Sequence, residues 1–300
     1  MDNLIYIDLI NKYLDYINDK TLQCKIGNLV GDILFNNFNR FVFNEEYIKK
    51  INVELSSVNS SYQDYFKNLI IKQLFDNNQI ISASDIILEN DNSIEKMFEY
   101  LSDNSKKLGF IPLSYNYEYK KCGVLKNAQI PNCHWIKEQL VSKGQLAVWP
   151  YNFENNNQIQ DFFNELFDLC KYMSVIYIQD DYCNINKHSL FNAISKKGYK
   201  INYYLCKIKG SKNTNDVLGE LKSKKNSLQE RLGRKTKIFY SFIGKMKHPR
   251  RILFNNFIIK VDNDWASIDK LNDGWNIDVY YDPVNYSKII AGLSSYKELL

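Results

Sequence analysis

Several common signatures of function are missing from this chain of 300 residues. It has no Gly-x-Gly-x-x-Gly and no Walker-type loop, so we expect neither a dinucleotide site nor a P-loop, and no cofactor. None of its six cysteines forms a Cys-x-x-Cys pair, so no metal site is expected. No apolar run approaches the roughly 18 residues of a membrane span, and the N-terminus lacks the marks of a signal peptide. These absences predict a cytoplasmic protein that does not contact membranes.

The charge and composition of the chain are those of an ordinary globular protein. The net charge is +5 and the pI is about 8.6, below the value of about 9 that marks a dedicated nucleic-acid domain. Hydrophobic residues make up 45% of the chain, enough for a sizeable core in two domains. The abundance of Tyr and Phe is attributed first to a genome rich in A and T, whose codons favour these residues. The alternative is that they form a surface on which nucleic-acid bases stack.

The first half of the chain predicts a helical domain followed by a less regular region. Apolar residues recur at helical spacing over residues 4–17, 29–38 and 62–74, which favours a mainly helical N-terminal domain over residues 1–105. Residues 106–160 contain several glycines and prolines and only short apolar runs. That pattern indicates an irregular connecting region with short strands.

The second half of the chain alternates between strand and helix patterns. Near-continuous apolar runs predict strands at residues 174–178, 200–206, 237–243 and 251–261. Helical patterns separate them at 159–172, 189–197 and 215–232. This alternation predicts an α/β domain over residues 161–300, with a mixed, mostly parallel sheet.

One segment of the second half concentrates candidate chemistry. His248 stands beside two arginines; a histidine acts as a nucleophile or proton shuttle, and arginines grip phosphate. Pro249 favours extended geometry at His248, which puts it at a junction between loop and strand. His248 is therefore the candidate catalytic residue. The candidate phosphate-binding residues are Arg250 and Arg251, supported by Asn255 and Asn256.

Two further groups of charged residues are candidates. Asp180 and Asp181 follow a predicted strand directly, where ligands bind in open α/β sheets. They would bind a cation or orient a histidine, or else satisfy their own loop or cap a helix. Lys235 and Lys237 belong to the main basic concentration, which is either a phosphate-tracking patch or a solvated helix face.

The order strand–Asp-Asp-Tyr–helix–strand–helix–strand–His-x-Arg resembles the phospholipase D-like domain at the C-terminus of MIT-domain proteins. It is also similar to bacterial relatives of that domain with a His-Asp-Arg signature. The resemblance covers roughly residues 166–262. It implies a phospholipase D-like fold. Because those bacterial relatives often accompany antiviral or conflict systems, it also implies a component of a bacterial defence system.

The motif departs from the family pattern at several positions. Pro249 replaces the usual Asp, Arg250 stands where phospholipase D has Lys, and neither His134 nor His188 fits a second motif. An active enzyme would have to form a homodimer to supply both nucleophile and acid. The expected function is therefore binding of phosphate or nucleic acid by a degenerate domain. A dimeric phosphodiesterase or nuclease using His248, and an adaptor subunit that binds protein partners without ligand chemistry, are the alternatives.

Overall fold

The computed structural model describes residues 1–18, 25–82, 111–113, 139–168, 175–180, 189–196, 198–207, 214–242, 250–263 and 265–300. The chain divides into two compact units, Met1–Gly144 (unit 1) and Gln145–Leu300 (unit 2). Residues 145–160, which the sequence assigned to a connecting region, belong to unit 2. No helix in the described ranges combines the length and apolar character that crossing a membrane requires.

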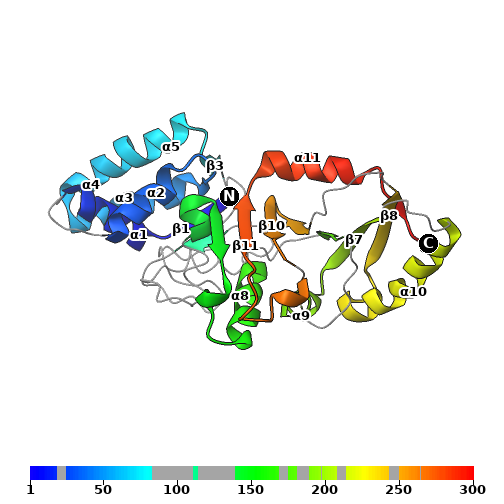
Figure 1. Cartoon of the computed structure of the whole chain (residues 1–300). Helices are drawn as coiled ribbons and strands as arrows, with labels where there is room; N and C mark the ends of the chain where they lie inside the picture. The colour runs from blue at the N-terminus through cyan, green and yellow to red at the C-terminus, as the bar shows by residue number, and fades with distance from the viewer. Residues whose placement is uncertain are drawn as a thin grey trace. The chain divides into compact units, whose positions relative to one another are not determined.

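Unit 1 combines helices with a parallel sheet (Figure 1). The described strands form the order β3-β2-β1-β4, and all their pairings are parallel. The strands are β1 Asp2–Ile5, β2 Arg40–Phe43, β3 Ile80–Ser82 and β4 Ile111–Leu113. The helices are α1 Ile7–Asn18, α2 Lys25–Phe35, α3 Glu45–Val58, α4 Ser60–Tyr65, the π-helical η1 Phe66–Ile71 and α5 Lys72–Asp76. The predicted mainly helical domain is thus not confirmed, since the unit also contains this sheet. Strands of three or four residues were too short for a period of two to show in the sequence.

Unit 2 is built on a mixed sheet of eight described strands in the order β12-β8-β7-β6-β9-β10-β11-β5. The strands are β5 Gln145–Val148, β6 Val175–Gln179, β7 Lys200–Lys207, β8 Lys237–Phe242, β9 Arg251–Phe254, β10 Phe257–Val261, β11 Ile277–Tyr281 and β12 Lys297–Glu298. The β6–β7 and β7–β8 pairings are parallel, and the other five are antiparallel. The α/β class is as predicted, but a mostly parallel sheet is not confirmed. Among neighbouring strands in the described ranges, only β6–β7 and β7–β8 are joined by a helical crossover.

Helices cover both faces of the unit 2 sheet (Figure 1). The helices α8 Asn156–Asp168, α9 Ser189–Lys196 and α10 Thr214–Leu232 lie on one side, and α11 Pro283–Leu293 lies on the other. Phe167 of α8 packs on Phe254, with ring centroids 5.3 Å apart. On the opposite face, Leu293 of α11 joins a buried cluster with Leu253 and Ile258. Two single turns, η2 Pro150–Asn152 and η3 Trp265–Ser267, complete the unit.

The strand predicted over residues 251–261 is in fact a hairpin of β9 and β10. Asn255 and Asn256 have positive φ values of 42° and 68°, and Phe254 pairs with Phe257 across the turn. A two-residue turn with positive φ at both positions favours Asn, whose side chain tolerates the left-handed region. The paired asparagines between two apolar runs were therefore the sequence signal for this turn.

Asp282 caps the N-terminus of α11, where its side chain accepts a hydrogen bond from the Asn285 backbone N–H at 2.9 Å. This hydrogen bond is the main cause that lowers the pKa of Asp282 below its ordinary value. Because folding favours the carboxylate, the stabilisation is present above the unfolded pKa of about 3.9 and is lost as pH falls through the folded pKa. We expect Asp282→Ala to lower the free energy of unfolding by about 1 kcal/mol at pH 7. Urea denaturation should show the difference shrinking toward pH 2, whereas a pH-independent difference would contradict this role.

Candidate functional site

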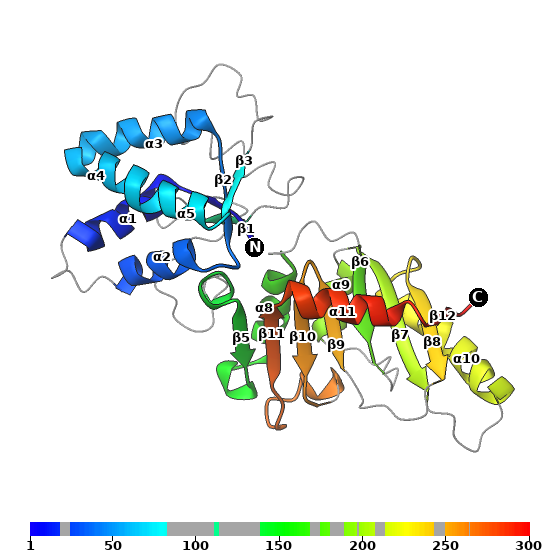
Figure 2. The ribbon, with the colours of Figure 1, turned by 90° about the horizontal axis from the view of Figure 1, so that it is seen from above.

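One edge of the unit 2 sheet brings together three of the predicted site residues. At this edge β6 ends and β9 begins, and we call it the β6–β9 edge; it is the lower edge of the sheet in Figure 2. Gln179, the last residue of β6, pairs with Arg251, the first residue of β9. Asp180 and Arg250 are the next residues outward on these two strands.

Arg251 is held in place by a short chain of hydrogen bonds. Its Nε donates to Gln179 Oε1 at 2.8 Å, and Gln179 Nε2 donates to the Tyr296 hydroxyl at 3.3 Å. Burial lowers the pKa of Arg251 below its ordinary value, and the nearby Tyr296 opposes that shift. An arginine stays charged in proteins, so this half-buried cation is more stable when an anion lies beside it.

Lys260 of β10 stands next to Arg251 on the same face of the sheet. The two residues pair in register, and directly opposite side chains have Cβ atoms about 5 Å apart. Lys260 Nζ lies 5.0 Å from the centroid of the Tyr280 ring. Among the residues that the structure describes, no ion pair is recorded for Arg251 or Lys260. Asp278 pairs with Lys260 from β11 and adds one carboxylate to this row.

Arg250 and Asp180 lie on the other face of the sheet. The Arg250 backbone carbonyl accepts a hydrogen bond from Val261 at 3.3 Å, which continues the ladder outward from Arg251. Since neighbouring side chains along a strand point to opposite faces, Arg250 and Arg251 do not form the joint clamp that their adjacency suggested. Asp180 is fully buried and accepts a hydrogen bond from the Tyr203 hydroxyl at 2.7 Å. Continuing the β6–β9 register by one residue sets Asp180 opposite Arg250, not Arg251.

Four predicted phosphate-binding residues lie away from the β6–β9 edge. Asn255 and Asn256 form the turn at the far end of β9 from Arg251. Because β8 runs parallel to β7 and β6, its first residue Lys237 lies at the opposite edge of the sheet, ion-paired with Glu298 at 3.2 Å. Lys235 is exposed in the turn that precedes β8. This geometry does not support their sharing a phosphate with Arg251.

The candidate nucleophile falls outside the described residues. So do Pro249, Asp181, His134 and His188, and five of the six cysteines. Catalysis by His248 and a role for the Asp180–Asp181 pair as a cation site therefore stay predictions. Within the described ranges, no cluster of three or more His, Cys, Asp or Glu residues is placed to hold a metal ion.

Three residues of the site were missed in the sequence, namely Gln179, Lys260 and Tyr296. Lys260 was recoverable, because a two-residue turn at Asn255–Asn256 fixes the register that sets it beside Arg251. Gln179 ends a predicted strand, where the acidic pair that follows it is the more conspicuous signal. Tyr296 had no local signal, because it reaches Gln179 across 117 residues of sequence.

No protein-family model and no curated protein matches the chain. Solved structures that resemble part of it include the following three. Nuc, a phospholipase D family member from Salmonella typhimurium, is 9% identical with a TM-score of 0.30, covering 42% of this chain and 81% of that one. Phosphatidylserine synthase from Haemophilus influenzae is 12% identical with a TM-score of 0.34, covering 51% of this chain and 39% of that one. Polyphosphate kinase from Porphyromonas gingivalis is 11% identical with a TM-score of 0.32, covering 50% of this chain and 25% of that one.

Similarities at this level do not assign the chain to a family.

Proposed function

We propose that unit 2 binds phosphate groups of nucleic acid at the β6–β9 edge, through Arg251 and Lys260. The observation that carries this proposal is the pair of cations on one face of adjacent strands, with no ion pair recorded for either within the described part of the chain. Phosphate contacts from Arg and Lys supply most of the sequence-independent affinity for nucleic acids.

The hydrogen bonds around Arg251 prepare it for an anion. Gln179 accepts from Nε, which orients the planar guanidinium and leaves the terminal N–H groups to make paired hydrogen bonds with phosphate oxygens. Lys260 adds a compact charge on a flexible stem. An anionic ligand would also offset the cost of keeping the Arg251 guanidinium partly buried.

The position of α11 is compatible with a ligand here. This helix begins after Tyr281, at the end of β11 that lies opposite the β6–β9 edge. Figure 2 shows it crossing in front of the strands nearer their other ends.

Paired charge-neutralising substitutions test the phosphate site. We expect Arg251→Gln with Lys260→Gln to weaken binding of a labelled single-stranded oligonucleotide by roughly 10-fold or more, because hydrogen bonds to charged groups contribute about 1.5–3 kcal/mol each. The plot of log K against log salt has a negative slope, and this slope should become shallower by about 1 for each phosphate that the protein no longer neutralises. Fluorescence anisotropy over a salt series measures both quantities in the full chain.

A matched pair elsewhere in unit 2 provides the control. Arg234→Gln with Lys235→Gln removes the same charge from an exposed turn, and it should leave the affinity nearly unchanged. Equal weakening by both pairs of substitutions would mean that diffuse electrostatic attraction, and not a defined site, binds the oligonucleotide. If neither pair weakens binding, the phosphate site is overturned and the adaptor function is the remaining alternative.

Catalysis, oligomeric state and biological setting are tested separately. If a phosphodiesterase assay detects turnover that His248→Ala abolishes in a folded protein, the site belongs to an enzyme, and a strict monomer would count against a shared single motif. A role in a bacterial defence system depends on the sequence resemblance, and the neighbouring genes test it directly.

A further inference from the structure

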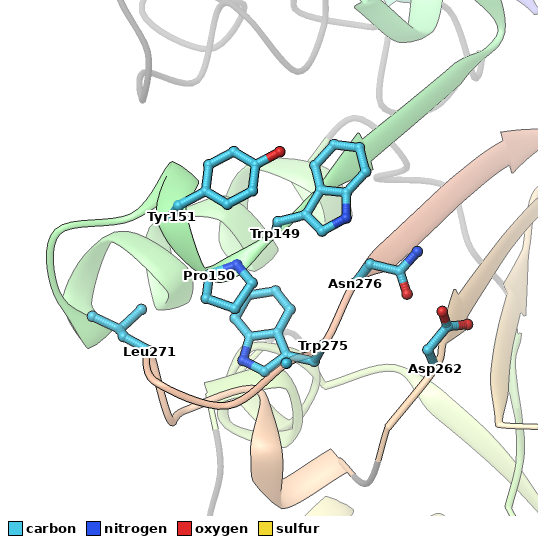
Figure 3. Close-up of a pocket in the computed structure, with 8 residues that line it drawn as sticks. Trp149, Pro150, Tyr151, Asp262, Leu271, Trp275 and Asn276 are labelled. Carbon is cyan, nitrogen blue, oxygen red and sulfur yellow. The ribbon is translucent and has the colours of Figure 1, made fainter.

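A groove lined by aromatic residues opens at the same edge of the unit 2 sheet. It is open to solvent, has a volume of about 550 Å³, and is lined by Trp149, Pro150, Tyr151, Asp262, Leu271, Gly274, Trp275 and Asn276. Trp149 and Tyr151 are 38% and 77% exposed, and their rings lie almost parallel, with centroids 5.7 Å apart. Figure 3 shows the two rings side by side, with Trp275 and Pro150 below them in the view. Two large exposed rings on one short turn are unusual for a surface without a ligand.

The turn that carries these rings is held firmly. Pro150 fixes its own φ, and the Trp149 N–H donates to Asn152 Oδ1 at 2.8 Å. The Phe153 N–H donates to the Pro150 carbonyl at 3.0 Å, and the Phe153 ring is buried against Phe162 and Trp275. A rigid aromatic surface loses little conformational entropy when it binds a flat ligand.

The opposite wall of the groove is polar and equally fixed. The Asp262 N–H donates to the Asn276 carbonyl at 3.3 Å, and Trp275 Nε1 donates to the Lys270 carbonyl at 3.1 Å. In Figure 3 the side chains of Asp262 and Asn276 lie together beside the rings. The Asn276 amide donates to Asp278 Oδ2 at 3.4 Å, whereas Asp262 is exposed. A carboxylate accepts hydrogen bonds, so Asp262 is the group of this wall that faces the hydrogen-bonding edge of a base.

Strand register connects the groove to the proposed phosphate site. Asp262 follows Val261 in β10, two residues beyond Lys260, a step of about 7 Å along a strand. Lys260 in turn pairs with Arg251. Continuing the alternation of β10 by one residue puts Asp262 on the same face of the sheet as Lys260, so the polar wall of the groove and the cations face the same side.

We propose that this groove is a base-binding subsite for single-stranded nucleic acid, in which one base stacks on Trp149 and Tyr151 while the neighbouring phosphate contacts Arg251 and Lys260. This proposal rests on the phosphate site described above. Bases of a duplex are stacked on each other, so the groove selects unpaired strands. Because Asp262 only accepts hydrogen bonds, it favours bases with an exocyclic amino group, such as cytosine, over thymine.

Removing the exposed ring tests the subsite. Trp149→Ala should weaken binding of a short labelled single strand by about 5- to 100-fold, the range for losing one stacked base. The salt slope should stay unchanged, because stacking releases no counterions. Trp149→Phe keeps a ring and should retain most of the affinity. Phe75→Ala removes a ring that is 70% exposed in unit 1 and should have no effect.

An abasic strand of the same length separates this proposal from the phosphate site. It keeps the phosphates, so it should bind the wild type and Trp149→Ala equally and more weakly than the normal strand binds the wild type. If abasic and normal strands bind the wild type alike while Arg251→Gln with Lys260→Gln still weakens both, the subsite is overturned and the phosphate site stands. If Trp149→Ala weakens binding and the cation pair has no effect, the phosphate site is overturned. If Trp149→Ala weakens binding of a soluble oligosaccharide and leaves binding of the oligonucleotide unchanged, the groove binds sugars and the base subsite is overturned.

The polar wall has its own measurement. The wild type should bind oligo(dC) more tightly than oligo(dT), and Asp262→Asn should reduce that preference. An unchanged preference in Asp262→Asn would remove Asp262 from base recognition.

Discussion

Phe254→Ala is expected to lower the free energy of unfolding of unit 2 by about 3–5 kcal/mol, the range for removing a buried Phe side chain. Phe254 is fully buried at the end of β9, with its ring centroid 5.3 Å from Phe167 of α8 and 5.6 Å from Phe257. Alanine would leave a cavity between the sheet and α8, and close-packed neighbours relax into such a cavity only partially. Removing this ring would loosen β9, the strand that begins with Arg251.

Urea denaturation followed by tryptophan fluorescence measures this change, because Trp265 and Trp275 are buried in unit 2 and change environment on unfolding. Tyr151→Ala is the matched control in the same unit, since it removes an aromatic ring that is 77% exposed. Its effect should stay within about 0.5 kcal/mol. A similarly small effect of Phe254→Ala would mean that α8 does not pack on β9 in solution.

Much of unit 2 was predictable from local sequence patterns. The apolar runs of β6, β7 and β8 and the helical spacing of α8, α9 and α10 agree with the structure to within a few residues at most of their ends. These elements alternate in the chain, and their parallel pairing follows from the crossovers between them. In unit 1 the strands β1 to β4 were hidden because each has only three or four residues. A single residue separates β1 from α1, so their apolar residues look like one helical run.

The site itself was less predictable because it depends on pairings that are remote in sequence. Arg251 was found from its residue type, but its partner Gln179 was not, because no local pattern says that β9 pairs antiparallel with β6. The aromatic groove depends on the pairing of β5 with β11, which brings Trp149 to the loop that carries Trp275. Lys235 and Lys237 were conspicuous in the sequence as part of a basic cluster. The direction of β8 puts them at the edge of the sheet opposite Arg251.

The two faces of the β6–β9 edge now have different expected roles. Arg251 and Lys260 occupy the α11 face, whereas Asp180 and Arg250 occupy the face covered by α8 and α9. Because the Asp180 carboxylate is fully buried, it is better suited to stabilise the ends of the strands than to contact a large ligand.

Tyr203→Phe tests that structural role and is expected to destabilise unit 2 by about 1.5–3 kcal/mol, the contribution of a hydrogen bond to a charged group. The substitution deletes only the hydroxyl that donates to Asp180 Oδ2 at 2.7 Å, and so leaves a fully buried carboxylate without that donor. In an Asp180→Ala background the same change should cost much less, because a double-mutant cycle isolates the pairwise interaction. Tyr151→Phe, which deletes an exposed hydroxyl, is the control for urea denaturation. Oligonucleotide affinity of the folded Tyr203→Phe protein should stay close to the wild type, and a large decrease would instead assign the Asp180 face to ligand binding.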